Sequence, residues 1–373
     1  MTAEVFFTPS AARGKDDVLS RRIAGMMEAT GFLGSLEAGD RVAVKVHPGE
    51  MGSTSYLRPA IASSIVESLL ARGARPFVTE TTTLYCRERF TAGELRRTAA
   101  HNGFTEETMG CRFVVGDAGP DVEVRAPGPY LESVGVASEI ARADALLVLA
   151  HFTAHLWTAG VAGAVKQLGM GCVGRRTKKE VHRSTTIEID RDLCVACGGC
   201  VEVCKSAGIE VVGDVAEITD GCARCGVCIG FCDEGAITYA HDLDRFAGGL
   251  AEAAAAAASC FPREKVVCVN ALVDVTWHCD CEDFSDDPVF PDIGVLVSRD
   301  PVALDQASAD LVNSATPCPG TLADTPEVLA ASDRLLALSG MEWWRHLEKA
   351  EQAGLGTRAY ILIPVPGTSV PNY

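Results

Sequence analysis

The sequence predicts an α/β protein, in which a mixed or parallel sheet with helices on both faces is interrupted by a small, cysteine-rich α+β insert. Two observations carry this prediction. Short β-branched and apolar segments alternate with segments of helical spacing along most of the chain, which is typical of strands covered by helices. Around residues 185–240 the alternation stops, and half of the 16 cysteines fall there. A chain of 373 residues is long enough for such a division.

The segment before the insert, residues 1–184, supplies most of the expected sheet. Residues 41–47 are β-branched and extended, and residues 60–72 place apolar side chains at helical spacing. The apolar run at residues 145–150 suits a buried parallel strand. Further strands are expected at residues 76–79 and 111–115, and a further helix at residues 94–103.

The segment after the insert, residues 241–373, resumes the same pattern. An alanine-rich helix is expected at residues 248–261, and strands follow at 265–269 and 293–297. Asp300 and Pro301 mark the start of a helix, because Asp caps helix N-termini and Pro suits the first helical position. Residues 327–353 are expected to form a helical tail packed on this domain.

Composition narrows the class of protein. The formal net charge is −17, which argues against binding to nucleic acid or to anionic membranes, since both require basic surfaces. No apolar run reaches the roughly 18 residues of a membrane span, and the N-terminus does not resemble a signal peptide. We therefore expect a cytoplasmic protein. In a reducing compartment, many cysteines indicate metal or redox chemistry rather than disulfides.

The insert contains a duplicated cysteine motif. Both halves have the spacing C-x2-C-x2-C-x3-C, and each cysteine recurs 28 residues later. In this spacing three thiolates of one loop bind one cubane cluster, while the fourth cysteine binds the other cluster. The predicted ligands are Cys194, Cys197, Cys200 and Cys232 for one [4Fe–4S] cluster, and Cys222, Cys225, Cys228 and Cys204 for the second. Two zinc sites are the alternative, but zinc motifs rarely have this spacing and its duplicate.

This insert resembles the bacterial-type ferredoxins that carry two [4Fe–4S] clusters. Two positions depart from their pattern, because Lys205 and Asp233 stand where a proline usually follows the fourth cysteine. A cation beside one cluster favours its reduced state, and an anion beside the other disfavours it. We therefore predict unequal potentials for the two clusters.

Three cysteines outside the insert are candidates for a further metal site. Cys279 and Cys281 lie two residues apart among carboxylates, and Cys172 lies in a glycine-rich turn after an expected helix. Three thiolates could hold a metal ion or a third [4Fe–4S] cluster with one open position, as catalytic metal sites require. The alternative is a pair of surface thiols and a core cysteine. The remaining cysteines are expected to be structural: Cys86, Cys111, Cys260, Cys268 and Cys318.

Polar residues gather where the predicted strands end, and ligands of open α/β sheets bind beyond the carboxyl ends of strands. His151 and His155 are four apart and could share one helical face, although a lone histidine is more often structural. The catalytic candidates are Lys45, His47, Glu50, His151, His155 and Lys166. The substrate-binding candidates at these ends are Arg58, Glu80, Thr81 and Thr83.

A short basic stretch precedes the insert and comprises Arg175, Arg176, Lys178, Lys179 and Arg183. Such a stretch is usually a solvated face. Residues 187–240 carry ten acidic and three basic residues, so the stretch could instead dock onto the insert, or it could capture an anionic substrate.

The chain also resembles the prokaryotic iron–sulfur proteins of the family called domain of unknown function 362, over residues 5 to 313. The matching motifs include Lys45 to Glu50, Glu80 to Tyr85, Gly163 to Cys172 and Cys279 to Cys281, with His182 a further matching position and substrate-binding candidate. The family commonly has Asn where this chain has Gln167, and Asp where it has Glu80. The resemblance supports the fold and the Cys172, Cys279 and Cys281 site, and it implies no substrate.

The leading hypothesis is an iron–sulfur oxidoreductase acting on a small anionic molecule, with an electron donor or acceptor protein or reductase as its partner. A sulfur- or metal-transferring enzyme with an open-site cluster is the second hypothesis, and a non-enzymatic electron carrier is the third. No GxGxxG fingerprint is evident, so no flavin or nicotinamide is assigned. The sequence leaves open a homodimer.

Overall fold

A computed structural model describes residues 2–11, 18–155 and 160–365 of the chain. Its centre is an eight-stranded sheet in the order β16-β1-β15-β14-β7-β2-β3-β4. The strands are β1 (Ala3–Pro9), β2 (Arg41–Lys45), β3 (Arg75–Glu80), β4 (Phe113–Val115), β7 (Ala145–His151), β14 (Val266–Leu272), β15 (Gly294–Ser298) and β16 (Tyr360–Pro364). Every neighbouring pair is parallel except the two pairs that include β15. The predicted mixed α/β fold is confirmed.

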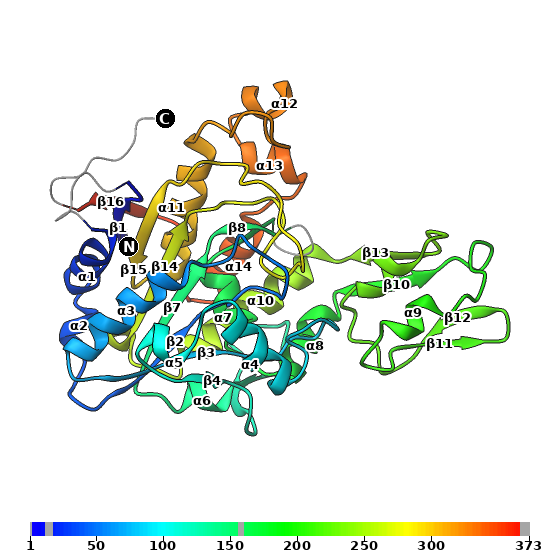
Figure 1. Ribbon diagram of the computed structural model, residues 1–373, viewed down its shortest axis with the longest axis horizontal. Coiled ribbons are helices and arrows are strands. Elements are labelled where there is room, and N and C mark those ends of the chain that lie inside the picture. Colours follow the sequence, from blue (N-terminus) through cyan, green and yellow to red (C-terminus); the bar gives the residue numbers. More distant parts are fainter. Residues whose placement is uncertain (1, 12–17, 156–159, 366–373) are drawn as a thin grey trace.

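Helices cover both faces of this sheet (Figure 1). Alternate residues of β2 show why: Val42 and Val44 pack into one core, and Ala43 packs into the other. The first core is closed by α1 (Leu19–Ala29), α2 (Phe32–Ser35) and α3 (Pro59–Ala71). The second is closed mainly by α7 (Ala164–Gly169), α10 (Leu243–Ala258), α11 (Pro301–Ser314) and α14 (Arg345–Gln352). The strands between two such layers are apolar on both sides, as the wholly buried β7 is.

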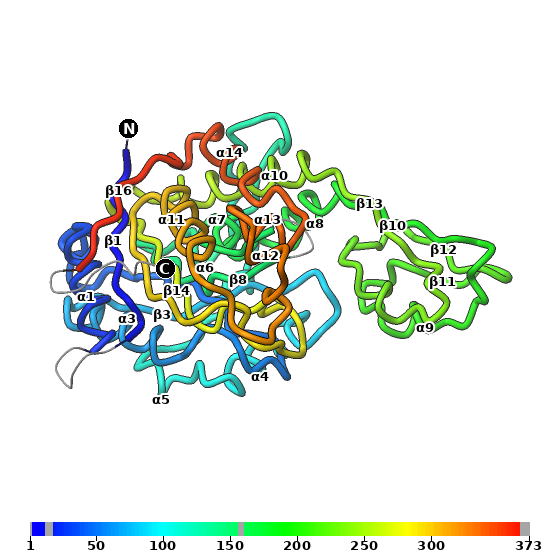
Figure 2. Tube along the Cα trace, turned by 90° about the horizontal axis from the view of Figure 1, so that it is seen from above, coloured from blue at the N-terminus to red at the C-terminus, as the bar shows by residue number. Residues whose placement is uncertain are grey.

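The cysteine-rich segment stands apart from the main sheet (Figures 1 and 2). The chain enters it through β10 (Thr185–Ile189) and leaves through β13 (Ile237–His241), which pair antiparallel. Between them lie α9 (Gly199–Glu202), the hairpin of β11 (Ile209–Val212) and β12 (Val215–Ile218), and the 3-10 helix η1 (Val227–Phe231). This segment has its own small core, separate from the two cores of the sheet.

Shorter elements complete the described part of the chain. They are α4 (Ala92–His101), α5 (Glu106–Met109), β5 (Val122–Arg125), β6 (Ser133–Val136), α6 (Ser138–Ala141), β8 (Thr153–His155), β9 (Gly160–Ala162), α8 (Arg175–His182), η2 (Arg263–Lys265), α12 (Pro326–Ala330) and α13 (Arg334–Ser339). The side chain of Asp300 caps α11, as its Asp-Pro start predicts. Among the described helices, none has the length and apolar character needed to cross a bilayer.

The structure corrects one expectation that bears on the site. His151 and His155 do not share a helical face, because His151 ends β7 and His155 ends the short strand β8. The expected helical tail is also broken into α12, α13 and α14 and is followed by β16, which pairs with β1 at the edge of the sheet.

Candidate metal and ligand site

The candidate site lies where the direction of the sheet's connections reverses. From β2 the chain crosses through α3 to β3 on one side, whereas β7 leads to β14 on the other side. A crevice therefore opens beyond the carboxyl ends of β2 and β7, which is where ligands bind in open α/β sheets. Lys45 ends β2 and His151 ends β7, and Cys279 and Cys281 lie on the loop that follows β14.

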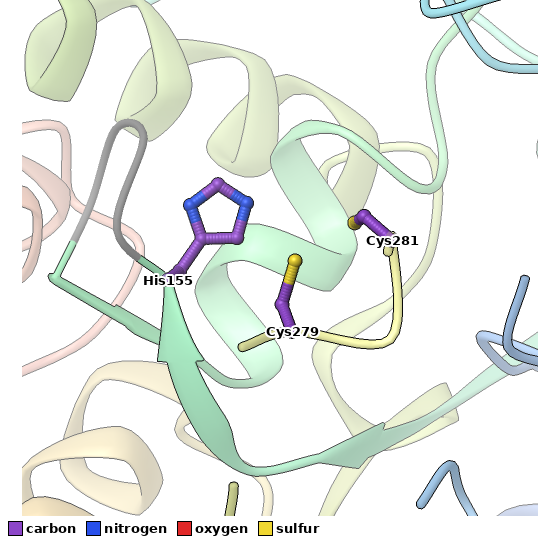
Figure 3. Close-up of side chains that lie close together, drawn as sticks. All are labelled: His155, Cys279 and Cys281. Carbon is purple, nitrogen blue, oxygen red and sulfur yellow. The ribbon is translucent and has the colours of Figure 1, made fainter. Parts of the chain in front are cut away.

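Three side chains in this crevice could hold a metal ion. One ligand atom each of His155, Cys279 and Cys281 lies within 4.8 Å of the others. Figure 3 shows the imidazole ring of His155, at the end of β8, and the two sulfur atoms of the loop facing a common space. His155 is buried, and burial together with the nearby Lys166 lowers its pKa. It is therefore a neutral imidazole, the form that binds metals.

The two thiols of this group differ in charge. The Nζ of Lys166 lies 3.7 Å from the Sγ of Cys281, and the Nε2 of His47 lies 3.6 Å from it. A hydrogen bond with Cys279 lowers the pKa of Cys281 well below its usual range, and Lys166, His155 and His47 lower it further. The pKa of Cys279 is raised by the same hydrogen bond and by burial. Cys281 is therefore the thiolate of the pair, and Lys166 is its counter-ion.

The structure does not bring Cys172 into this group. Its side chain is fully buried in the core that α7 and α10 close, and burial raises its pKa to about 12. Such a thiol stays protonated and behaves as a small apolar side chain. His155 instead stands beside Cys279 and Cys281.

A buried ionic network forms the floor of the crevice. The Nζ of Lys45 lies 2.8 Å from Glu80 and donates hydrogen bonds to Gln167 and to the carbonyl oxygen of Val46. Burial alone would raise the pKa of Glu80, but Lys45, His47 and Arg89 more than offset that effect. All three protons of the Lys45 ammonium are thus engaged, so we assign Lys45 to the support of the site.

Arg89 is a site residue that the sequence did not reveal. It is 1% exposed, its Nε donates to Glu50 at 3.2 Å, and it also hydrogen-bonds to Tyr85. Coulombic attraction from Tyr85 and Glu50 raises the pKa of Arg89 despite burial. It lies on a loop without a recognisable motif, and the only signal is a charged run before α4.

His151 supports the site by holding the loop that carries the two cysteines. Its Nδ1 lies 2.8 Å from Asp280, and its Nε2 lies 2.6 Å from the carbonyl oxygen of Val273. Burial alone would lower the pKa of His151, but Asp280 raises it above the ordinary value. With both ring nitrogens engaged, His151 positions the Cys279–Cys281 loop.

A cavity of about 760 Å³ joins the crevice to the cysteine-rich segment. Ten of the fourteen predicted site residues outside the cysteine-rich segment line it, and these are His47, Glu50, Glu80, Thr81, Thr83, His155, Lys166, His182, Cys279 and Cys281. Its other wall includes Arg224, Cys225 and Phe231 of the insert. Arg58 lies elsewhere, because it is exposed and paired with Asp274 and Asp292. The structure thus gives no support to Arg58 as an anion-binding residue of this cavity.

The insert brings the predicted outer ligands together. We call Cys194, Cys197, Cys200 and Cys232 the outer set and Cys204, Cys222, Cys225 and Cys228 the inner set. All four members of the outer set line one pocket of about 100 Å³. Backbone amides of Ala216 and Gly208 donate to the sulfur atoms of Cys194 and Cys204, at 3.4 and 3.2 Å.

Cys225 is the member of the inner set that lines the cavity. Burial and the nearby Cys222, Cys200 and Cys204 raise the pKa of Cys228 to about 11. Cys225 hydrogen-bonds to Cys86 of the α/β domain, which lowers the pKa of Cys86 to about 6. Cys86, expected to be an ordinary cysteine, therefore stands at the junction of the insert and the cavity.

Backbone conformation repeats along with the motif. Ala196 and Arg224 are equivalent positions in the two halves and have φ values of 53° and 56°. The glycines that follow two residues later, Gly198 and Gly226, have φ values of 82° and 74°. Left-handed residues at matched positions turn each cysteine loop back on itself, and glycine takes this conformation without steric cost.

The fold and the site define a class: a mixed α/β protein with a Cys2His group at its strand ends and a duplicated cysteine segment facing the same cavity. The chain belongs to the family described as domain of unknown function (DUF362), whose model matches residues 42–310. Solved structures that resemble it include the lactate racemase apoprotein from Thermoanaerobacterium thermosaccharolyticum, with 11% sequence identity and a TM-score of 0.33. That alignment covers 74% of this chain and 51% of the racemase chain, so this chain spans about half its neighbour's length. A search of curated proteins found no match.

Proposed function

We propose that the protein is an iron–sulfur oxidoreductase that passes electrons, one at a time, between a partner protein and a small molecule bound in the cavity. One observation carries this proposal. The same cavity is lined by Cys225 of the inner set and by His155, Cys279 and Cys281 of the candidate metal group. A cluster held by the inner set would thus border the space in which a substrate meets the metal.

The two cysteine sets fit two [4Fe–4S] clusters. Each set offers four thiols, the number that a cubane requires, and the outer four already line one small pocket. Amide donors to Cys194 and Cys204 resemble the hydrogen bonds that stabilise cluster sulfur atoms. In this arrangement the inner cluster borders the cavity, and the outer cluster lies beyond the inner cluster, farther from the cavity.

The Cys2His group fits a single metal ion with an open position. Two thiolates and a neutral imidazole are common ligands of catalytic zinc. Donor atoms of a tetrahedral zinc site lie about 3.7 Å apart, so the present group needs only a small contraction. Cys281 is already a thiolate and His155 is already neutral. A bound ion would polarise a substrate oxygen as a Lewis acid.

Residues of the chain itself would move the protons. A cubane carries one electron at a time, so a two-electron change of the substrate takes two transfers, and a one-electron carrier protein supplies or accepts both. Each electron can be matched by one proton exchanged with the substrate. His47 and Lys166 face both the cavity and Cys281, and they are our candidates for this exchange.

Metal analysis of anaerobically purified protein tests the proposal. We expect about eight irons and about eight acid-labile sulfides per chain, with EPR signals of reduced cubanes, plus one further metal. His155→Ala and Cys279→Ala should lose the further metal and keep the iron. Cys260→Ala, a part-buried cysteine outside both groups, is the matched control and should lose neither. Eight irons without another metal would rule out the proposed Cys2His metal site. An iron-free protein would rule out the proposed redox function.

A further inference from the structure

The basic stretch of α8 does not act as one surface. Arg175 packs over the ring of Phe90, Arg176 pairs with Glu123, and Lys179 donates to the carbonyl oxygen of Asp220. Lys178 alone among these turns inward, is 6% exposed and lines the cavity. The helical period explains why Lys178 is buried and its basic neighbours are not. One face of the amphipathic helix α8 packs on the protein, and Lys178 lies on that face with Thr177 and Val181.

The ammonium of Lys178 is held by neutral acceptors. Its Nζ donates to the Oγ1 of Thr81 at 2.7 Å and to the carbonyl oxygen of Thr82 at 2.5 Å. In the described part of the chain, no carboxylate forms an ion pair with it. A buried cation without an anion is costly, so such a charge is usually paired.

The other cations near the cavity already have partners. Lys45 is paired with Glu80, Arg89 with Glu50, and Lys166 with the Cys281 thiolate. Arg224 is engaged by backbone carbonyls of Arg183 and Thr185. Two bonds to threonines fix the position of the Lys178 nitrogen and leave one N–H for a ligand.

We propose that Lys178 binds the oxyanion, a carboxylate or a phosphate, of a ligand whose apolar body fills the rest of the cavity. This rests on the proposed function only in taking the cavity as the substrate site. Thr81, which receives the Lys178 hydrogen bond, is then a positioning residue. The apolar part of the cavity is lined by Leu84, Met170, Val227, Phe231, Phe246 and Phe284. A volume of about 760 Å³ suits an organic acid or phosphate ester with a ring or chain.

The charge state of Lys178 gives the binding a distinct pH dependence. Burial and the nearby Lys45 and Arg89 lower its pKa to about 8, although Asp117 and Glu80 oppose them. The charged and titratable groups that act on this ammonium or respond to it are Lys45, Glu80, Arg89, Asp117, Asp121, Cys172 and His182. The ammonium exists below its pKa, so oxyanion binding should weaken as pH rises through about 8.

Calorimetric titration of the cluster-containing protein with benzoate, phenyl phosphate and neutral benzamide tests this proposal. We expect one or both anions to bind and benzamide to bind at least about tenfold more weakly, because a hydrogen bond to a charged group is lost. Binding of benzoate alone indicates a carboxylate ligand, and binding of phenyl phosphate alone indicates a phosphate. Lys178→Met should weaken anion binding about tenfold or more, and Lys179→Met is the matched control with wild-type affinity.

Lys178→Arg, which keeps the positive charge, is a second variant that tests the proposal even if Lys178→Met does not fold. Its guanidinium stays charged at pH 9, so it should retain anion binding there while the wild-type protein loses it. No anion binding, equal binding of benzamide, or a pH-independent wild-type affinity overturns the proposal. Iron content and EPR on the same samples separate the two proposals. Anion binding by a protein without redox-active clusters would rule out only the proposed oxidoreductase function. Intact clusters in a protein that does not prefer anions would rule out only the proposed role of Lys178.

Discussion

Val195 and Ala223 occupy equivalent positions in the two halves of the insert, yet Val195 is 61% exposed and Ala223 is 5% exposed. The same difference holds for the next equivalent cysteines, since Cys197 is exposed while Cys225 is part-buried and contacts Cys86. A duplicated sequence therefore serves two surroundings, one facing solvent and one facing the α/β domain. Under the proposed function, the exposed half would exchange electrons with a partner protein and the part-buried half would exchange them with the cavity.

Removal of one equivalent cysteine from each half should have the largest effect. Cys194→Ala should lose the outer cluster and Cys222→Ala the inner cluster, each with about four of the eight irons, because three thiolates hold a cubane poorly. Iron analysis and EPR of both variants measure the loss. A variant that keeps all its iron, or loses all of it, would contradict two independent ligand sets.

An acidic residue at the equivalent positions 195 and 223 should separate the two halves by stability. Ala223→Asp places a carboxylate in a buried position and should lower the free energy of unfolding by about 1–3 kcal/mol. Val195→Asp, on the exposed side, should change it by less than about 0.5 kcal/mol. Thermal unfolding of both variants under argon compares them. Equal destabilisation would mean that the inner half does not pack as the structure has it.

The smallest expected effect concerns the two potentials. Lys205 follows Cys204 of the inner set and Asp233 follows Cys232 of the outer set, so the inner cluster should have the higher potential. Asp233→Asn should raise the outer potential by on the order of tens of millivolts. Lys205→Met should lower the inner potential by a similar amount, because it removes one positive charge and leaves Glu94, which lies 2.9 Å from Lys205, unpaired. EPR-monitored redox titration gives both values, and a single shared potential would refute the asymmetry.

The sequence predicted the centre of the fold better than its edges. The apolar residues of β7 identify a buried strand without ambiguity, and Asp300 with Pro301 marks the start of α11. β16 at the sheet edge was missed, because it is half-exposed and its pairing with β1 joins the two ends of the chain. Such long-range pairing leaves no local pattern.

The candidate site shows the same limit. The cysteines at 279 and 281 were recognisable from their two-residue spacing, but the third member of the group is His155 rather than Cys172. Four-residue spacing of His151 and His155 suggested a helix, whereas the chain there is extended and places each on a different strand. Spacing also could not distinguish the buried Lys178 from its more exposed basic neighbours, because the inward face of α8 depends on where that helix packs.

The antiparallel pairing of β10 with β13 determines where the inserted segment could be separated from the α/β domain. Thr185 and His241 are register partners, so the two points where the chain leaves and rejoins the α/β domain lie side by side. Partners across an antiparallel pair are about 5 Å apart, a gap that a two-residue turn closes. We therefore expect that the α/β domain can be produced with a short turn in place of the intervening residues. The same geometry would allow those residues to be inserted into a hairpin of another protein.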